Sequence, residues 1–93
     1  MSEPYRSTPV FDASSLPAAL QREHRTKPGV WGVIRILEGT VDLTFADGTP
    51  DKRLTPDNPG LILPDQAHWV TPQGDFRMRI DFYDAPPVLP NGD

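Results

Sequence analysis

Residues 30–37 read Val-Trp-Gly-Val-Ile-Arg-Ile-Leu and contain the strongest strand signal in the chain. The stretch is rich in β-branched and aromatic residues and follows a Pro-Gly pair, which is typical of a β-strand that begins after a turn. Apolar side chains occupy both alternating sets, so Ile34 and Ile36 are expected to face inward while Val33 faces outward. An outer face of this kind predicts a contact with another subunit.

Further runs on the C-terminal side show strand alternation as well. Residues 41–45 alternate Val, Leu and Phe with Asp and Thr, and Glu38-Gly39 before them predicts a chain reversal into a hairpin. Asp47-Gly48 predicts a type I′ hairpin turn, and a weaker strand should follow and end near Leu54. Residues 76–83 alternate apolar and polar side chains, which predicts a long amphipathic closing strand.

The remaining segments are shorter or ambiguous. Residues 61–63 indicate a buried strand, and the turn at residues 64–67 leads into His68, where the strand continues. Residues 16–24 fit either a helix of about two turns or an extended strand, and we favour the strand. Twelve prolines and seven glycines interrupt the chain too often for long helices. We therefore predict an all-β fold of about six to eight short strands, a jelly-roll sandwich or a small barrel.

The length of 93 residues predicts one domain, because a chain of this size has no surface to spare for a second core. We expect residues 1–15 to be an extended, partly mobile arm that Phe11 pins to the core. Residues 16–85 should form the single β domain, and residues 86–93 a flexible tail that leaves the fold.

Composition excludes several classes of protein. The net charge of −4 argues against binding to nucleic acid or to an anionic membrane. The absence of cysteine excludes disulfides, thiolate ligands and a cysteine nucleophile. No apolar run reaches the roughly 18 residues of a membrane span, and the polar start lacks the regions of a signal peptide. We therefore expect a cytoplasmic protein.

The two histidines are the best functional clue. His24 and His68 are far apart in sequence, yet each lies beside a turn signal that leads into or out of a strand. A small β-barrel needs such placement to bring two imidazoles to one interior site. Each histidine could equally be a hydrogen-bonded polar group at the mouth of a barrel.

Several separated motifs, in order, are similar to one known family. They are His24, the Pro-Gly-Val-Trp-Gly segment at 28–32, Leu-Glu-Gly at 37–39, Pro64 followed by His68-Trp69, and Ile-Asp-Phe-Tyr at 80–83. Together they resemble the small cupin-like family related to TehB and YeaR, which is associated with tellurite resistance. The resemblance covers about residues 7 to 88 and implies a cupin-type barrel, usually a homodimer. Members occur alone or joined to the methyltransferase part of tellurite-resistance proteins, for which this chain is too short.

The resemblance also implies where a site would lie. Cupins carry a first motif with two histidines and a glutamate, and a second motif with one histidine, which His68 matches. In the first motif His24 could stand for one histidine, Lys27 falls near the other, and Gly32 takes the approximate place of the glutamate. The usual metal site would therefore be reduced.

Two imidazoles can bind Zn²⁺, Ni²⁺ or Fe²⁺, but a catalytic centre normally needs a third protein ligand. Asp81 could complete the set, although simple alternation places it opposite the face of Ile80 and Phe82 unless a bulge intervenes. Lys27 and Arg22 could make the mouth of the site cationic and favour a small anion, or they could be solvated charges.

These observations support three functional hypotheses. The first is a small-molecule or metal-binding module linked by resemblance to a tellurite or oxyanion stress response, with His24 and His68 at its site. The second is a metal-dependent enzyme of the dioxygenase or isomerase type that uses two histidines and one carboxylate. The third is a structural dimerisation module, in which Trp31 is the preferred contact residue.

Overall fold

The computed structural model describes residues 3–89, and within them one antiparallel sheet of six strands contains nearly all of the regular structure. The elements in chain order are β1 (Arg6–Ser7), β2 (Phe11–Asp12), the 3₁₀ helix η1 (Ala18–Gln21), β3 (Trp31–Phe45), β4 (Lys52–Leu54), β5 (Gly60–Ile62) and β6 (His68–Tyr83). The sheet order is β1-β6-β3-β4, with β2 also on β6 and β5 also on β3. The predicted all-β class is confirmed, but the sheet is open, so the predicted closed barrel is not confirmed.

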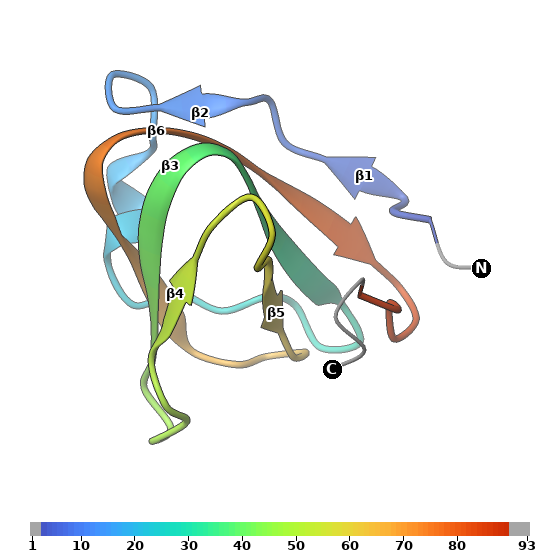
Figure 1. Ribbon diagram of the computed structural model, residues 1–93. Helices are drawn as coiled ribbons and strands as arrows, with labels where there is room; N and C mark the ends of the chain where they lie inside the picture. The colour runs from blue at the N-terminus through green and yellow to red at the C-terminus, as the bar shows by residue number, and fades with distance from the viewer. Residues whose placement is uncertain (1–2, 90–93) are drawn as a thin grey trace.

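Two long strands form the centre of the molecule. β3 and β6 pair from Trp31↔Tyr83 to Phe45↔His68, and both ribbons curve over together (Figure 1). The predicted reversal at Glu38-Gly39 is wrong, because β3 runs through this pair as one strand of 15 residues. Gly39 instead has φ of +83° and lies at shifts in strand register, which bend a strand without ending it. A Cβ at Gly39 would collide with the backbone of β6, so glycine permits the close approach.

The concave side of the bent sheet encloses the main core. Ile34 and Ile36 lie there as predicted, with exposed fractions of 1% and 4%. The alternation of side chains along β3 and β6 explains why most of the other members come from alternate positions in these two strands. Leu54 and Ile62 come from β4 and β5. The buried members of this core are Ile34, Ile36, Val41, Leu43, Phe45, Leu54, Ile62, Val70, Phe76, Met78 and Ile80.

The outer face of β3 is partly covered by the end of the described chain. Val33 is fully buried there against Tyr83 and Leu89, and Leu89 itself is only 5% exposed. Burial of this apolar side chain offsets the cost of ordering the segment up to residue 89. The flexible tail at residues 86–93 stays a prediction. Residues 90–93 lie outside the described part. A homodimer stays a prediction, and Val33 is not free to contact a partner.

The N-terminal part of the chain adds two strands and a short helix. β1 and β2 pair with β6, and Phe11 packs against the main core as expected. The strand we favoured for residues 16–24 is wrong, since η1 occupies this segment. In this helix the Leu20 N–H donates to the Pro17 carbonyl at 3.0 Å. Leu16 and Leu20 both pack onto the core. One helical turn brings these two leucines to the same side, which an extended chain would place farther apart.

The connection from β3 to β4 also differs from the prediction. Pairing of these strands begins at Leu43↔Lys52, so the loop is longer than the two-residue turn that Asp47-Gly48 predicts. The Asp47 carboxylate accepts hydrogen bonds from the Thr49 N–H and the Gln66 side chain, which stabilise this longer loop. Within residues 3–89 we find no helix with the length and apolar character needed to span a membrane.

Candidate functional site

His24 and His68 face each other across a two-residue antiparallel bridge. The N–H of each donates to the carbonyl of the other, at 3.0 Å for the His24 N–H and 2.9 Å for the His68 N–H. Directly opposed residues of an antiparallel pair project to the same side, so both imidazoles leave the backbone together. Their ring centroids are 4.1 Å apart and the ring planes are tilted by 58°. The structure thus brings together the two residues that the sequence singled out.

Both rings have the same local hydrogen bond, and it fixes which ring nitrogen carries the hydrogen in the neutral form. The Nδ1 of His24 is 2.8 Å from the carbonyl oxygen of Arg22, and the Nδ1 of His68 is 2.7 Å from that of Gln66. A carbonyl oxygen only accepts, so Nδ1 must carry the hydrogen in each ring. In the neutral form this leaves Nε2 as the acceptor. Neither Nε2 has a hydrogen-bond partner within residues 3–89.

His68 is held in the neutral form. It is only 3% exposed, and burial lowers the pKa of its imidazole to about 4. The hydrogen bond to the Gln66 carbonyl raises the pKa, while the neighbouring charge of His24 lowers it further. At neutral pH the Nε2 of His68 therefore keeps its lone pair.

Both imidazoles line a cavity of about 240 Å³ on the concave side of the sheet. Most of its wall is apolar and comes from β3, β5, β6 and the helix η1. The other lining residues are Leu20, Arg25, Thr26, Gly32, Ile34, Ile62, Ile80 and Phe82. Two Nε2 acceptors in a largely apolar cavity are the arrangement expected of a binding site that orients a small molecule.

The donor set does not complete a metal centre. Among residues 3–89 no cluster of three or more His, Cys, Asp or Glu side chains is placed to hold a metal ion. Gly32, which takes the approximate place of the cupin glutamate, lines the cavity without a side chain. Two imidazoles alone are one protein ligand short of the three that catalytic zinc sites use.

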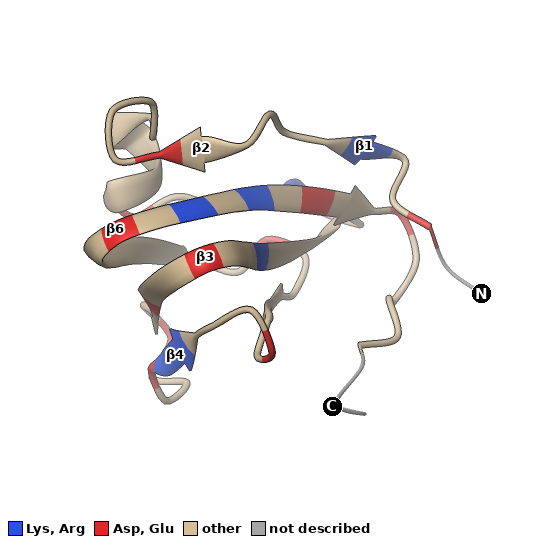
Figure 2. Cartoon of the chain, turned by 45° about the horizontal axis from the view of Figure 1, so that its top comes forward, with Lys and Arg blue, Asp and Glu red and all other residues tan. Residues whose placement is uncertain are grey.

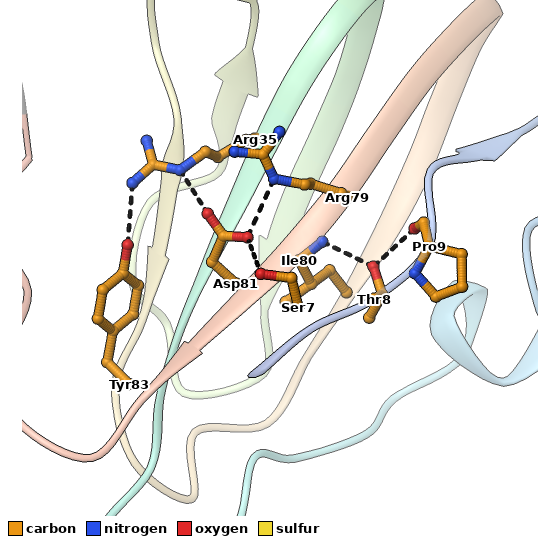
Figure 3. Close-up of polar contacts among 8 residues, drawn as sticks. All are labelled: Ser7, Thr8, Pro9, Arg35, Arg79, Ile80, Asp81 and Tyr83. Carbon is orange, nitrogen blue, oxygen red and sulfur yellow. Dashed lines mark hydrogen bonds and ion pairs between the residues drawn. The ribbon is translucent and has the colours of Figure 1, made fainter. Parts of the chain in front are cut away.

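Asp81 does not join the histidines, because it lies on the opposite face of β6 from Ile80 and Phe82, as simple alternation indicated. Its carboxylate accepts hydrogen bonds from the Ser7 hydroxyl at 2.7 Å, from Arg35 Nε at 2.7 Å and from Arg79 Nε at 3.0 Å (Figure 3). Burial raises the pKa of this carboxyl, but these three donors outweigh burial and the pKa is lowered. Every observed contact of Asp81 is therefore structural.

The two cations predicted for the mouth lie in separate places. Arg22 lines a shallow hollow with Gln21, Glu23 and Trp69, and Lys27 lines a different hollow beside the histidine cavity. The cation that lines the cavity itself is Arg25, which the sequence analysis missed. Its position between His24 and Lys27 was the available signal, since a segment that delivers one site residue often delivers its neighbours.

Comparisons with known proteins place this geometry in context. A model of the TehB-like domain family matches residues 6–80. The crystal structure of TehB from Haemophilus influenzae is similar over 87% of this chain, with 26% sequence identity and a TM-score of 0.76. A crystal structure of a protein from E. coli strain K12 is similar over 92% of this chain and 93% of its own length, with 24% identity and a TM-score of 0.80.

The match to TehB is partial, because it spans only 30% of that protein. The E. coli likeness shows the fold alone. A search of curated proteins found no match.

Proposed function

Because this chain belongs to the TehB-like domain family, we propose that it is a cupin-like module that binds a small molecule in the cavity of His24 and His68. The tellurite or oxyanion stress response that the family resemblance implies is the proposed setting. The proposal needs no resident metal, since the cavity has two imidazoles and no third ligand among residues 3–89.

One observation carries the proposal, namely the pair of Nε2 acceptors without a partner in a largely apolar cavity. The described residues contain no buried side-chain nitrogen or oxygen without a hydrogen-bond partner. Both Nε2 atoms are therefore accessible from the cavity that the imidazoles line, where a donor on a small molecule can reach them. Both imidazoles are also fixed by backbone carbonyls, so their orientation costs little on binding.

The chemistry of the wall defines the ligand class. A cavity of about 240 Å³ lies below the roughly 300 Å³ at which pockets for drug-sized ligands begin, so the ligand is small. Its body should be apolar, because Ile34, Ile62 and Ile80 form much of the wall. It should carry a hydroxyl or amine, because only a donor can satisfy the Nε2 atoms.

Phenol and toluene form a matched pair of probes for this proposal. Toluene has the same shape and is the more hydrophobic of the two, so a purely apolar cavity binds it more tightly. Two histidine acceptors should reverse this preference, because the phenol hydroxyl can donate to Nε2. We expect NMR shift titrations of the wild-type protein to favour phenol. The double variant His24→Phe/His68→Phe should favour toluene, because phenol has one hydroxyl hydrogen and a single remaining Nε2 could still accept it.

Gly32→Ala tests the cavity without touching the histidines. A Cβ at Gly32 would make ordinary contacts of 3.5 Å with Thr26 and 3.6 Å with Ile62, so the variant should fold normally. It should weaken binding of both probes, because the new methyl narrows the cavity at two of its lining residues. Equal binding of phenol in the wild type and Gly32→Ala, or a wild-type preference for toluene, would refute the proposed function.

A further inference from the structure

A second hollow, of about 200 Å³, adjoins the histidine cavity and is lined by Tyr5, Arg6, Arg25, Thr26, Lys27, Val30 and Phe82. Three of these lining residues are basic and none is acidic. Arg25, Thr26 and Phe82 line both spaces, so the two lie side by side. We call the second space the cationic hollow.

Its positive charge is only partly compensated. Arg25 pairs with Asp65 at 3.6 Å, and this pair is exposed. Arg6 and Lys27 make no ion pair or side-chain hydrogen bond with any residue in 3–89. Two cations without an ion pair beside one cavity are notable in a chain whose net charge is −4, because the net charge alone would repel anions. Figure 2 shows that charges of both signs follow each other along β6. The charged residues that line the hollow, in contrast, are all basic.

Backbone contacts place both free cations. Lys27 begins a turn in which the Val30 N–H donates to the Lys27 carbonyl at 3.1 Å, and Gly29 has φ of +78°. A Pro-Gly pair at the centre fits a type II turn. Arg6 lies in β1 opposite Phe82, and the Tyr5 N–H donates to the Phe82 carbonyl at 2.9 Å. Both backbones are therefore anchored, and only the side chains need to adapt to an anion.

We propose that the cationic hollow binds the carboxylate of the molecule whose apolar, hydroxyl-bearing part enters the histidine cavity. The natural ligand is then a small hydroxylated carboxylic acid. This inference rests on the proposed function and extends it from a neutral ligand to an anionic one. Phe82 lines both spaces, Val30 adds to the apolar wall of the hollow, and Arg6 and Lys27 supply the charge-assisted hydrogen bonds.

Hydroxybenzoate, as its ortho, meta and para isomers, is the probe, with phenol as the match that lacks the carboxylate and benzoate as the match that lacks the hydroxyl. We expect the best isomer to bind about threefold to tenfold more tightly than phenol at low salt. The advantage should shrink at about 0.3 M salt, because exposed charges are screened there.

The double variant Arg6→Gln/Lys27→Gln should bind hydroxybenzoate no better than phenol, with phenol binding unchanged. Arg77→Gln/Lys52→Gln is the matched control, since it removes the same net charge from residues outside the hollow and should keep the advantage. Equal affinities of hydroxybenzoate and phenol in the wild type would refute carboxylate binding in the cationic hollow but not the histidine site. Equal losses of hydroxybenzoate affinity in the two double variants would have the same meaning. Hydroxybenzoate binding that is unchanged in the double variant His24→Phe/His68→Phe would leave the hollow standing and refute the histidine site. Absence of binding by all probes would overturn both.

Discussion

Two polar clusters lie on opposite faces of the same pair of strands, and they differ in how completely their polar atoms are bonded. On the outer face, Asp81 receives three donors, and Arg35 also donates to the Tyr83 hydroxyl at 3.1 Å. On the inner face, the imidazoles of His24 and His68 are each hydrogen-bonded through Nδ1, and within residues 3–89 neither Nε2 has a partner beside the cavity. Both clusters contain a buried titratable group, at 2% exposure for Asp81 and 3% for His68.

How completely the polar atoms are hydrogen-bonded distinguishes a structural cluster from a binding site better than the buried fraction of the side chains does. A carboxylate with all of its contacts inside the protein has little left to offer a ligand, and its loss should be felt in folding. An imidazole with a free acceptor beside a cavity contributes little to folding through that atom, and its loss should be felt in binding. The following predictions test this division.

The largest effect is expected from Asp81→Ala. Removing the carboxylate leaves two guanidinium groups next to a buried gap, which typically costs about 3 to 5 kcal/mol in a buried pair. The Arg35 and Arg79 side chains are 26% and 37% exposed, so water can reach them and we expect about 3 kcal/mol. Chemical denaturation measures the loss. Asp75→Ala, an exposed carboxylate on the same strand, is the control and should change the free energy of unfolding by less than about 0.5 kcal/mol.

The affinity for phenol, measured under conditions where Asp81→Ala is fully folded, should be the same as in the wild type. A variant that keeps its stability but loses phenol binding would reverse the assignment of the two clusters.

The next effect is a pH dependence that belongs to the histidine cluster. The pKa of His68 is lowered from 6.5 to about 4, so the unfolded chain binds a proton at a pH where the folded protein does not. Stability is therefore retained above pH 6.5 and lost as the pH falls toward 4. Between pH 7 and pH 5 the loss should be roughly 2 kcal/mol. Asp81 has a lowered pKa and contributes its own loss only below the ordinary value of 3.8, so the two losses are separable.

NMR titration of the His68 ring measures its pKa directly and does not depend on unfolding. A value near 6.5 would contradict the neutral buried imidazole. In His68→Phe the loss of stability between pH 7 and pH 5 should largely disappear.

The sequence predicts the clusters unevenly, for a physical reason. Alternation in residues 76–83 correctly separates Asp81 from Ile80, because a regular strand has a period of two. The sequence also pairs His24 with His68, through family resemblance and their place at strand edges. It does not predict the partners of Asp81, since Ser7 and Arg35 lie 74 and 46 positions away and meet it only through sheet register.

The errors at glycine have a common cause. Gly39 and Gly48 were both interpreted as tight reversals, and both do have positive φ. Positive φ is shared by hairpin turns, bulges and longer loops, and the choice among them depends on what the neighbouring strand does. At Gly39 the partner strand β6 bends together with β3, so β3 continues as one strand. Leu89, in the segment predicted as a tail, packs with Val33 and Tyr83 on the face that the sequence pattern indicates is the outer one.

The smallest effect is expected from Tyr83→Phe, which probes the edge of the outer cluster. The change removes the acceptor of one hydrogen bond from Arg35 Nη2 but keeps the ring, which packs with Val33 and Leu89. Arg35 retains its bond to Asp81 and is partly exposed, so water can replace the lost acceptor. We expect a loss of about 1 kcal/mol, near the net value of a single hydrogen bond. Tyr5→Phe, at a tyrosine that is 55% exposed, is the matched control for stability and should have almost no effect. A loss of stability in Tyr83→Phe as large as that in Asp81→Ala would show that the Tyr83 hydroxyl, and not the Asp81 carboxylate, holds the outer cluster together. A loss in phenol binding would show that the two faces are coupled through β6.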